Sequence, residues 1–197
     1  MTKPTDLKST LNLPKTDFPM KASLPKAEPV QLEKWEAEGI YARIQKAREN
    51  APTYVLHDGP PYPTGAIHLG TALNKILKDI VVKSKTMAGF RSPYVPGWDC
   101  HGLPIEIKAL QAQKEQGVGD GNGKARSRLS AVQVREAARQ LAARTIHKQM
   151  EGFKKWAVMG DWENAYTTMN KDFEMRQLGV FKEMVEKGEV RLWNCDV

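Results

Sequence analysis

The chain has 197 residues, of which 41% are hydrophobic, and its 30 Lys and Arg against 23 Asp and Glu give a formal net charge of +7 at pH 7. This composition is typical of a globular chain of about one domain and excludes a disordered tail. No run approaches the roughly 18 apolar residues of a membrane span, so we expect no membrane partner. Two cysteines exclude a disulfide framework. The positive charge suits nucleic acid, although a basic chain does not require such a partner.

Residues 1–30 predict an irregular N-terminal arm, because five prolines interrupt any helical pattern there, and residues 31–197 predict the domain that follows. The prolines are Pro4, Pro14, Pro19, Pro25 and Pro29. The arm holds five lysines and three acids but no arginine, and it lacks the apolar run of a secretory signal. We expect either a cytoplasmic protein or a mitochondrial (matrix) protein whose presequence has been removed upstream.

Two elements are predicted before the first loop. Between Val30 and Ile44, apolar residues recur at helical spacing, with a break expected at Gly39. Residues 54–57 are short, apolar and β-favouring, and they predict a strand that leads into a loop over residues 58–65.

The strongest helical pattern covers residues 69–88, and Gly89 is placed to end it. Its apolar positions predict the face that packs on the core, and its polar positions predict the face toward water. The apolar set is Leu69, Ala72, Leu73, Ile76, Leu77, Ile80 and Val81, and the polar set is Asn74, Lys75, Lys78, Asp79 and Lys83. Residues 92–95 predict a second strand and residues 96–104 a second loop. This order indicates an α/β fold with a parallel sheet, whose ligands gather beyond the carboxyl ends of the strands.

The C-terminal half predicts helices after one insertion. Residues 117–124 carry four glycines in eight positions. We interpret them as a flexible insertion, since a phosphate loop would need a preceding strand and a closing Gly-Lys-Ser/Thr. Helical patterns follow from about Ser130, from Met150 to Met159 and from Asp172 to Lys187. Basic residues on the first of these predict a solvated face, with phosphate contact as the alternative; they are Arg135, Arg139, Arg144 and Lys148.

The segment from Gly65 to Thr71 places an imidazole and a glycine where a loop becomes a helix. The first turn of a helix offers unpaired N–H groups and a positive dipole end, which together bind phosphate oxygens. His68 can donate to a phosphate whose charge grows in a transition state. Gly70 leaves room for a base or a ribose, and Thr71 adds a hydroxyl donor. The alternative is a purely structural helix start.

The second loop, ahead of a helix expected near Pro104, holds Asp99 beside Trp98. A carboxylate there can neutralise a substrate ammonium, or it caps the helix. His57 and Asp58 favour the simpler interpretation of a strand end followed by an Asx turn. No spacing of His, Cys, Asp or Glu predicts a protein-bound metal, and no arrangement predicts a thiol nucleophile.

Two strings carry a family resemblance. The run from His57 to Asp79, which includes Gly-Pro-Pro-Tyr-Pro-Thr-Gly-Ala-Ile-His-Leu-Gly-Thr, resembles the first signature of class I aminoacyl-tRNA synthetases. The run from Tyr94 to Glu106 is similar to the isoleucyl-tRNA synthetase family of the bacterial and mitochondrial type. With shorter matches, the resemblance covers residues 10–190. It implies the N-terminal half of the catalytic core, a Rossmann-like parallel sheet with flanking helices, truncated before the editing insertion.

The resemblance also implies chemistry. Such enzymes activate L-isoleucine with ATP, as its Mg²⁺ complex, to isoleucyl-adenylate and transfer it to tRNA(Ile), and we expect a monomer in the full-length enzyme. By position, catalysis is assigned to His68 and Thr71, with no protein-bound metal in this segment. The ATP-binding residues are then His68, Gly70, Thr71 and Asn74. The amino-acid-binding residues are Gly59, Pro60, Tyr62, Trp98 and Asp99, with the Asp99 carboxylate on the substrate ammonium.

Three departures from the family pattern qualify these assignments. Thr71 stands where the signature has a second histidine, and we expect altered ATP handling because a hydroxyl brings no positive charge. The chain stops before the Lys-Met-Ser-Lys-Ser loop, most or all of the editing domain and the anticodon-binding helices. Residues 191–197 also depart from the expected run, so we expect a fragment or a truncated gene model that is inactive alone. The alternatives are a catalytically incomplete ATP- or tRNA-binding module, or a small nucleotidyltransferase with the same His-x-Gly helix start.

Overall fold

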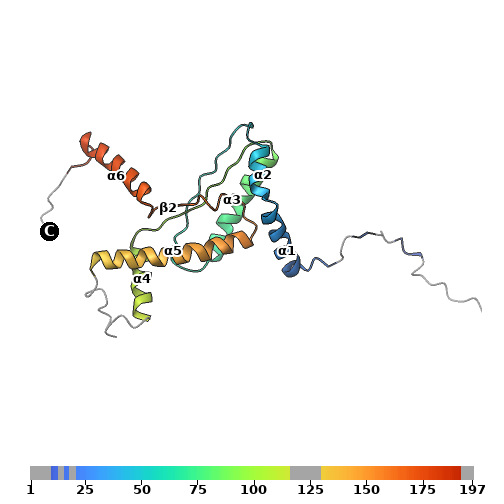
Figure 1. The fold of residues 1–197 in the computed structure, drawn as a ribbon, viewed down its shortest axis with the longest axis horizontal. Helices are drawn as coiled ribbons and strands as arrows, with labels where there is room; N and C mark the ends of the chain where they lie inside the picture. The colour runs from blue at the N-terminus through green and yellow to red at the C-terminus, as the bar shows by residue number, and fades with distance from the viewer. Residues whose placement is uncertain (1–9, 13–15, 18–20, 116–129, 192–197) are drawn as a thin grey trace, which may run out of the picture. The chain divides into compact units, whose positions relative to one another are not determined.

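The structure is a computed structural model that describes residues 10–12, 16–17, 21–115 and 130–191 (Figure 1). The chain divides into two compact units, Met1–Glu38 and Gly39–Val197. The predicted flexible insertion at residues 117–124 and the C-terminal departure from residue 192 onward lie outside the described residues. Among the described helices, none is long and apolar enough to cross a membrane.

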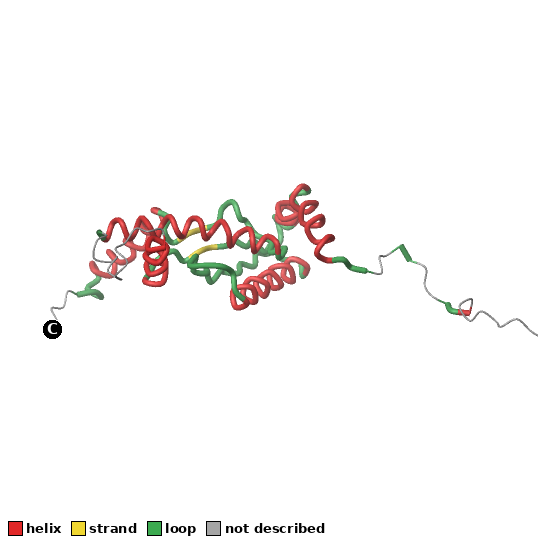
Figure 2. Tube along the Cα trace, turned by 90° about the horizontal axis from the view of Figure 1, so that it is seen from below, coloured by secondary structure: helices red, strands yellow, loops and turns green. Residues whose placement is uncertain are grey.

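Helices make up most of the described chain, and extended segments join them. In chain order the elements are α1 (Leu24–Ala37), α2 (Ile40–Ala47), α3 (Leu69–Met87), β1 (Gly97–Trp98), α4 (Leu103–Glu115), α5 (Ala131–Lys155), β2 (Tyr166–Thr167) and α6 (Lys171–Glu186). Helix α1 belongs to the first unit and the other elements to the second. Figure 2 shows the two short strands side by side.

Helix α1 begins inside the segment for which the sequence predicts an irregular arm. Its first turn contains Pro25, and Pro29 lies within the helix. Proline is tolerated in the first turn because the N–H groups there have no partner inside the helix. Pro29 removes one further backbone donor. The prediction of irregular chain up to residue 30 is therefore wrong from Leu24 onward.

The helix break predicted at Gly39 is confirmed, and α2 begins directly after it. Gly39 has a φ of +59°, a left-handed conformation that glycine adopts without steric cost. From α2, the Tyr41 hydroxyl accepts from the Tyr94 N–H at 3.1 Å, and the Gln45 side chain donates to the Ser92 carbonyl at 3.4 Å. These bonds hold α2 beside an extended segment of the same unit.

Parallel backbone pairing joins three stretches of the second unit. Strand β1 pairs in parallel with β2. On the other side, residues 53–61 run parallel to residues 91–99, with backbone bonds at both ends. Even-numbered carbonyls of 91–99 accept from residues 161–168, and odd-numbered groups bond to residues 52–61. The parallel direction predicted for the two segments on either side of α3 is confirmed.

Regular strands do not form at residues 54–57 and 92–95, where the sequence predicts them. The side of 91–99 that faces residues 53–61 lacks a donor at Pro93. At Gly97 the N–H is bonded to the Asp58 carboxylate rather than to backbone, at 2.9 Å. These two interruptions leave the segments extended and parallel without a continuous ladder.

Helix α3 begins and ends where the sequence predicts, and Gly89, with φ of +98°, follows its last turn. However, the face of α3 that packs on the core is the opposite of the one predicted. The buried residues are Lys75, Asp79 and Val82. Predicted core residues are instead on the surface, with Leu69, Leu73 and Leu77 exposed by 89%, 61% and 53%. The apolar pattern gave the helix correctly, but within this unit it does not mark the face that packs.

The later helices follow the sequence closely, with one exception. A capping box starts α5, in which the Ser130 hydroxyl accepts from the Gln133 N–H and the Gln133 side chain accepts from the Ser130 N–H. The helix then runs to Lys155, so the separate helix predicted over residues 150–159 is wrong. The start of α4 near Pro104 is confirmed, as is α6 to within one residue at each end.

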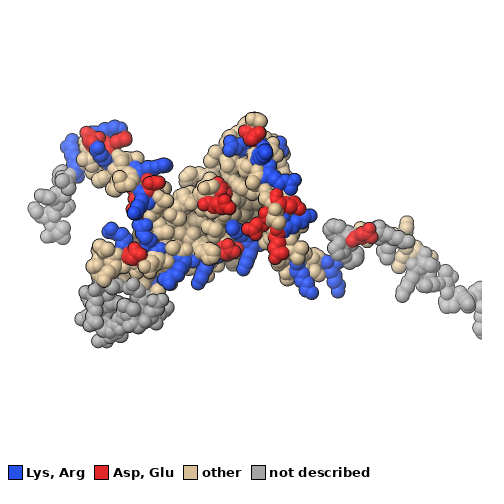
Figure 3. Space-filling model, in the orientation of Figure 1, with Lys and Arg blue, Asp and Glu red and all other residues tan. Residues whose placement is uncertain are grey.

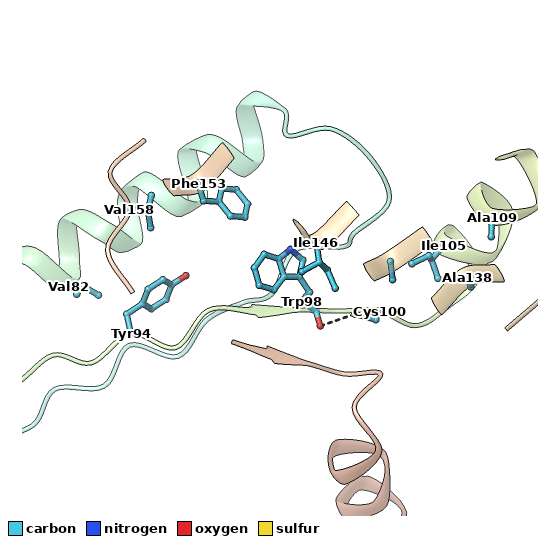
Figure 4. Packing of buried hydrophobic residues seen from close by; sticks show 11 residues of the cluster. Val82, Tyr94, Trp98, Cys100, Ile105, Ala109, Ala138, Ile146, Phe153 and Val158 are labelled. Atoms are coloured by element: carbon cyan, nitrogen blue, oxygen red, sulfur yellow. Dashed lines mark hydrogen bonds between the residues drawn. The ribbon is translucent and has the colours of Figure 1, made fainter. Parts of the chain in front are cut away.

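The core lies between the extended segment 91–99 and helices α3, α4 and α5 (Figure 4). Tyr94 and Trp98 are fully buried and share one face of the segment. Tyr94 contacts Lys75 of α3, and Trp98 lies 6.3 Å from the Phe153 ring of α5, measured between ring centroids. Helices α3 and α5 therefore pack on the same face of the segment, the one that carries Tyr94 and Trp98.

Candidate functional site

A cleft of about 360 Å³ lies beyond the carboxyl end of the first extended segment, between the loop that follows it and the first turns of α3. Its lining residues are Gly59, Pro61, Tyr62, Thr64, Gly65, Ala66, His68, Gly70, Thr71, Asn74 and Gln149. A parallel sheet collects its ligands at this position. The volume is at the lower end of the roughly 300–1,000 Å³ of small-molecule sites. All four predicted ATP-binding residues thus share one cleft.

His68 is the N-cap of α3, and its ring holds the helix start in place. Its Nδ1 accepts from the N–H of Gly70 at 3.1 Å and of Thr71 at 3.4 Å. A ring nitrogen that accepts carries no proton, so the proton of the neutral imidazole is on Nε2. The N–H groups predicted to bind phosphate are therefore bonded to the imidazole, and the donor that His68 offers is Nε2–H.

Gly70 allows this close approach of the imidazole. A Cβ on residue 70 would lie 3.0 Å from the Cε1 atom of His68, closer than ordinary contact. The sequence predicts room for a base or ribose over Gly70, but in this structure the histidine ring takes that space. Thr71 is half-buried and Asn74 exposed, and both line the cleft from α3.

Behind the cleft, the carboxylate of Asp58 joins three segments. Its Oδ2 accepts from Lys75 Nζ at 2.5 Å and from the Gly97 N–H at 2.9 Å, and its Oδ1 accepts from Lys78 Nζ at 2.5 Å. Asp58 is 2% exposed and Lys75 is 0% exposed. The predicted Asx turn is wrong, because the residue two positions on, Pro60, has no N–H to donate. We call Asp58, Lys75 and Lys78 the Asp58 cluster.

Electrostatics within this cluster favour the ionised carboxylate. Burial raises the pKa of Asp58, but the charge of Lys75 and the hydrogen bonds from Lys75, Lys78 and Gly97 outweigh it and hold the pKa below its ordinary value. Burial lowers the pKa of Lys75 by more than the charge of Asp58 raises it. Burial and the Asp58 charge raise the pKa of Tyr94, whose hydroxyl accepts from Lys75 at 2.9 Å. The cluster is thus anchored by a buried carboxylate at neutral pH.

The residues predicted to bind the amino acid occupy different positions. Gly59 and Tyr62 line the cleft, and Tyr62 is 50% exposed. Pro60 is half-buried between lining residues. The carbonyl of Gly59 already accepts from Lys78 Nζ at 3.0 Å, so Lys78 occupies one oxygen of this loop.

Trp98 supports the cleft from beneath rather than lining it. Its side chain is fully buried, and its Nε1 donates to Gln149 Oε1 at 2.9 Å. Gln149 Nε2 in turn donates to the carbonyls of Gly65 at 2.8 Å and Tyr62 at 3.3 Å. Gln149 is not among the residues predicted to form the site. Its only signal is a polar residue at helical spacing among the buried positions of α5.

Asp99 lies next to the cleft on the neighbouring segment. Its N–H donates to the carbonyl of Pro61, a lining residue, at 3.0 Å. Its half-buried carboxylate has Oδ1 3.5 Å from the Thr168 hydroxyl. The structure therefore joins Asp99 to the same loop that leads to His68. The roles of Asp99 in binding the amino acid and of His68 in binding ATP stay predictions.

A larger groove of about 930 Å³ begins just after Asp99 and runs between α4, α5 and α6. Arg139, on the predicted basic face of α5, pairs there with Glu174 at 3.6 Å. In the view of Figure 3, Lys and Arg are spread over several elements with Asp and Glu among them. Over the described part of the chain, no three His, Cys, Asp or Glu side chains form a group that could hold a metal ion.

The model of tRNA synthetases class I (I, L, M and V) matches residues 30–193. The chain belongs to this family. The matched residues contain the cleft, the Asp58 cluster and Asp99, so the family assignment covers the whole candidate site.

Curated relatives with about half of their aligned residues identical are isoleucine–tRNA ligases. The ligase of Desulfitobacterium hafniense (strain DSM 10664 / DCB-2) is 53% identical over 182 residues, 92% of this chain and 19% of the relative. The ligase of Natranaerobius thermophilus is 50% identical over 183 residues, 93% of this chain and 19% of the relative. That of Thermotoga petrophila is 51% identical over 185 residues, 94% and 19% respectively. The chain therefore spans about a fifth of the length of these relatives.

A solved structure shares the fold. It is the ternary complex of Agrobacterium radiobacter K84 agnB2 LeuRS with tRNA and LeuAMS, with a TM-score of 0.63 and 16% identity, over 85% of this chain and 18% of that chain. The chain therefore has the class I synthetase catalytic-domain fold, rich in helices with a small parallel sheet.

Proposed function

We propose that this chain forms the N-terminal part of the catalytic domain of an isoleucine–tRNA ligase, which activates L-isoleucine with ATP and transfers it to tRNA(Ile). The shared cleft carries the proposal, because all four predicted ATP-binding residues line it and the identity to isoleucine–tRNA ligases extends over 92% of the chain. A Rossmann-like sheet, with residues 53–61, 91–99 and 161–168 as its first three strands, is part of the same proposal.

In this proposal the cleft holds ATP, with Mg²⁺ as the counter-ion of its phosphates. His68 donates from Nε2 to a phosphate oxygen as charge grows there, while its Nδ1 keeps the start of α3 in place. The side chains of Thr71 and Asn74 bind ATP from the next turns. The Asp99 carboxylate binds the ammonium of isoleucine, which positions the substrate carboxylate for attack.

A chimera tests the proposal. In it, this chain replaces the matched fifth of the Desulfitobacterium hafniense ligase. We expect isoleucine-dependent exchange of pyrophosphate into ATP by the chimera, and little or none by the 197-residue chain alone. His68→Ala and Asp99→Asn should each lower the exchange by about 100-fold or more. Exchange that needs no isoleucine, or that survives both substitutions, would contradict the proposal.

The chimera also tests the departure at residue 71. An imidazole can bring a positive charge to the phosphates, whereas the Thr71 hydroxyl can only donate a neutral hydrogen bond. We therefore expect Thr71→His to change the KM for ATP while leaving the KM for isoleucine nearly unchanged. Unaltered ATP kinetics would refute the assignment of Thr71 to the ATP site.

A further inference from the structure

Gln149 is a buried polar residue of α5 that bridges the loop of the cleft and strand β1. It is 4% exposed. Its Oε1 accepts from Trp98 Nε1, and its Nε2 donates to the carbonyls of Gly65 and Tyr62. Because an indole N–H can only donate and a carbonyl can only accept, these partners fix the orientation of the amide. Both amide hydrogens are therefore engaged, and Gln149 has none left for a ligand.

The three bonds require a side chain with one acceptor and two donors at the same end. A glutamate carboxylate has no hydrogen for the two carbonyls, and a leucine would leave the Trp98 N–H and both carbonyls without a partner. Trp98 directly precedes Asp99, and Gly65 lies three positions before His68. Gln149 thus connects the approach to His68 with the segment that carries Asp99.

Gly152, on the same side of α5, makes a second contact with this loop. It follows Gln149 by three positions, a spacing that places two residues on one face of a helix. A Cβ on residue 152 would lie 2.3 Å from Cδ1 of Ile67, so the missing side chain makes room for Ile67. Ile67 directly precedes His68 and packs against the buried core. Helix α5 therefore contacts both ends of the stretch from Tyr62 to Ile67.

Few other interactions hold residues 62–67. Within the described part of the chain, no backbone–backbone hydrogen bond involves these residues. Pro63 is fully buried, whereas residues 64–66 are half-buried or exposed. The place of this loop beside β1 therefore depends on side-chain contacts, among them the two with α5.

We propose that Gln149 and Gly152 are positioning residues for the activation of isoleucine. They hold residues 62–67 in place beside β1, and in this way they align His68 and Asp99 across the cleft. The inference rests on the proposed function, in which these two side chains act on ATP and on the ammonium of isoleucine. Gln149 and Gly152 act through the loop rather than on the substrates. A misplacement of about 1 Å at a reacting group can slow a reaction about 100-fold.

Gly152→Ala in the chimera with the Desulfitobacterium hafniense ligase tests the contact with Ile67. Alanine favours a helix interior more than glycine, so the urea midpoint of the 197-residue chain should not fall. We expect kcat for pyrophosphate exchange to fall about 10-fold, with the KM values for ATP and isoleucine within about 3-fold of wild type. Ile67→Val removes Cδ1, the atom nearest the new Cβ. The double variant should recover kcat to within about 3-fold of Ile67→Val alone.

Gln149→Leu in the same chimera tests the amide bonds. The matched control is Gln140→Leu, because Gln140 lies on the same helix but is exposed and donates to Glu136 at the surface. We expect Gln149→Leu to lower kcat about 100-fold with both KM values within about 3-fold of wild type. Gln140→Leu should leave the exchange unchanged.

Nuclear magnetic resonance of the 197-residue chain gives a readout that does not need catalysis. The Asp99 N–H donates to the Pro61 carbonyl at 3.0 Å, so its amide resonance reports how the loop lies beside β1. We expect the amide resonances of His68 and Asp99 to shift in Gln149→Leu and to stay in place in Gln140→Leu.

Several results would overturn the positioning role. An unchanged kcat in both Gln149→Leu and Gly152→Ala would do so, as would a kcat lost in Gly152→Ala that Ile67→Val does not recover. A raised KM with kcat retained would make Gln149 a substrate contact instead. A wild-type chimera without exchange defeats the proposed function alone, and unmoved His68 and Asp99 resonances then defeat the positioning. If Gln149→Leu does not fold, Gly152→Ala and its recovery decide the question.

Discussion

Asp58 shows how one side chain can connect the parts of a site that sequence places apart. Its carboxylate bonds Lys75 and Lys78 of α3, which also carries His68 at its start, and the N–H of Gly97, two residues before Asp99. The Asp58 carbonyl accepts from the Tyr166 hydroxyl at 3.1 Å. The loop and the helix of the cleft, and the segment that carries Asp99, are therefore held by this one residue.

Asp58→Asn should cost the chain about 3–5 kcal/mol of unfolding free energy, because it leaves Lys75 buried beside a neutral amide. Urea unfolding of this chain measures the loss. The matched control is Glu186→Gln, which removes an exposed ion pair with Lys182 and should change stability by less than about 0.5 kcal/mol. Equal stability of the wild-type and Asp58→Asn chains would show that the cluster does not contribute.

The pH dependence separates charge from packing in the same pair of proteins. The pKa of Asp58 is lowered in the folded chain, so its contribution is fully present above the ordinary Asp pKa of about 3.9 and is lost as pH falls through the folded value. The stability difference between wild type and Asp58→Asn should stay constant from about pH 7 to pH 5 and shrink below about pH 4. A constant difference down to pH 3 would assign the loss to packing alone.

His68 combines a structural and a chemical role that two substitutions separate. His68→Ala should cost about 1 kcal/mol, because Gly70 and Thr71 lose their acceptor, whereas His68→Asn keeps a capping oxygen and should cost little. In the chimera, however, neither variant should retain pyrophosphate exchange, because the amide cannot replace the Nε2–H donor in the same position. Asn as destabilising as Ala would contradict the cap, and exchange restored by Asn would contradict the chemistry.

For individual residues, the sequence predicted the parts of the site that lie close together in the chain. It missed the contacts between residues that are distant in the chain. The four positions predicted to bind ATP, with His68 at the helix start among them, line one cleft. The pairing of Asp58 with Lys75 spans 17 residues, and the bonds from Gln149 to Tyr62 and Gly65 span more than 80. No periodicity connects positions so far apart.

For whole helices and strands, too, the sequence predicts local features better than long-range packing. Spacing and end signals located α3, α6 and the start of α5, because capping and turn chemistry act within a few residues. The prediction of which face of α3 packs on the core was wrong. An apolar stripe shows that a surface is suited to burial but does not show what it packs against. The strands were misplaced because Pro93 and the Gly97–Asp58 bond interrupt the ladder, and only the second of these is invisible in the sequence.

The packing of β1 against β2 depends on the absence of a side chain at Gly97. A Cβ there would lie 2.1 Å from the Tyr166 ring, so Gly97→Ala should displace the ring and cost about 1–3 kcal/mol or more. Gly179→Ala on α6 is the matched control, since nothing lies within 4 Å of its Cβ position and alanine should stabilise a helix interior by about 1 kcal/mol. Urea midpoints that move in the same direction for both variants would contradict the close contact.

Across the whole molecule, burial is distributed unevenly. Helix α5 has six buried residues, whereas α6 has none. The buried set of α5 is Ala138, Ala142, Thr145, Ile146, Gln149 and Phe153. Local opening is easiest where few side chains are packed, so the molecule has a stable centre around α5 and a weakly held helix after β2.

Hydrogen exchange by mass spectrometry measures this distribution. Amides in the middle of α5 should exchange at least about 10-fold more slowly than those in the middle of α6, because opening α5 exposes the core and opening α6 does not. A peptide from the exposed first turn of α5, which contains Val132, gives the internal control. Equal protection of the two helices would show that α6 is held by contacts beyond those of this unit.

Because the charged residues of α3 are buried and its leucines are exposed, substitutions on its two faces have different effects on this unit. Replacing Lys75 or Asp79 affects whether this unit reaches its native state, because both are buried and paired. A serine in place of Leu73 or Leu77 changes only side chains that are already in water here. A screen for soluble expression of this chain would therefore accept polar substitutions at Leu73 and Leu77 freely, and would reject substitutions at Lys75 and Asp79.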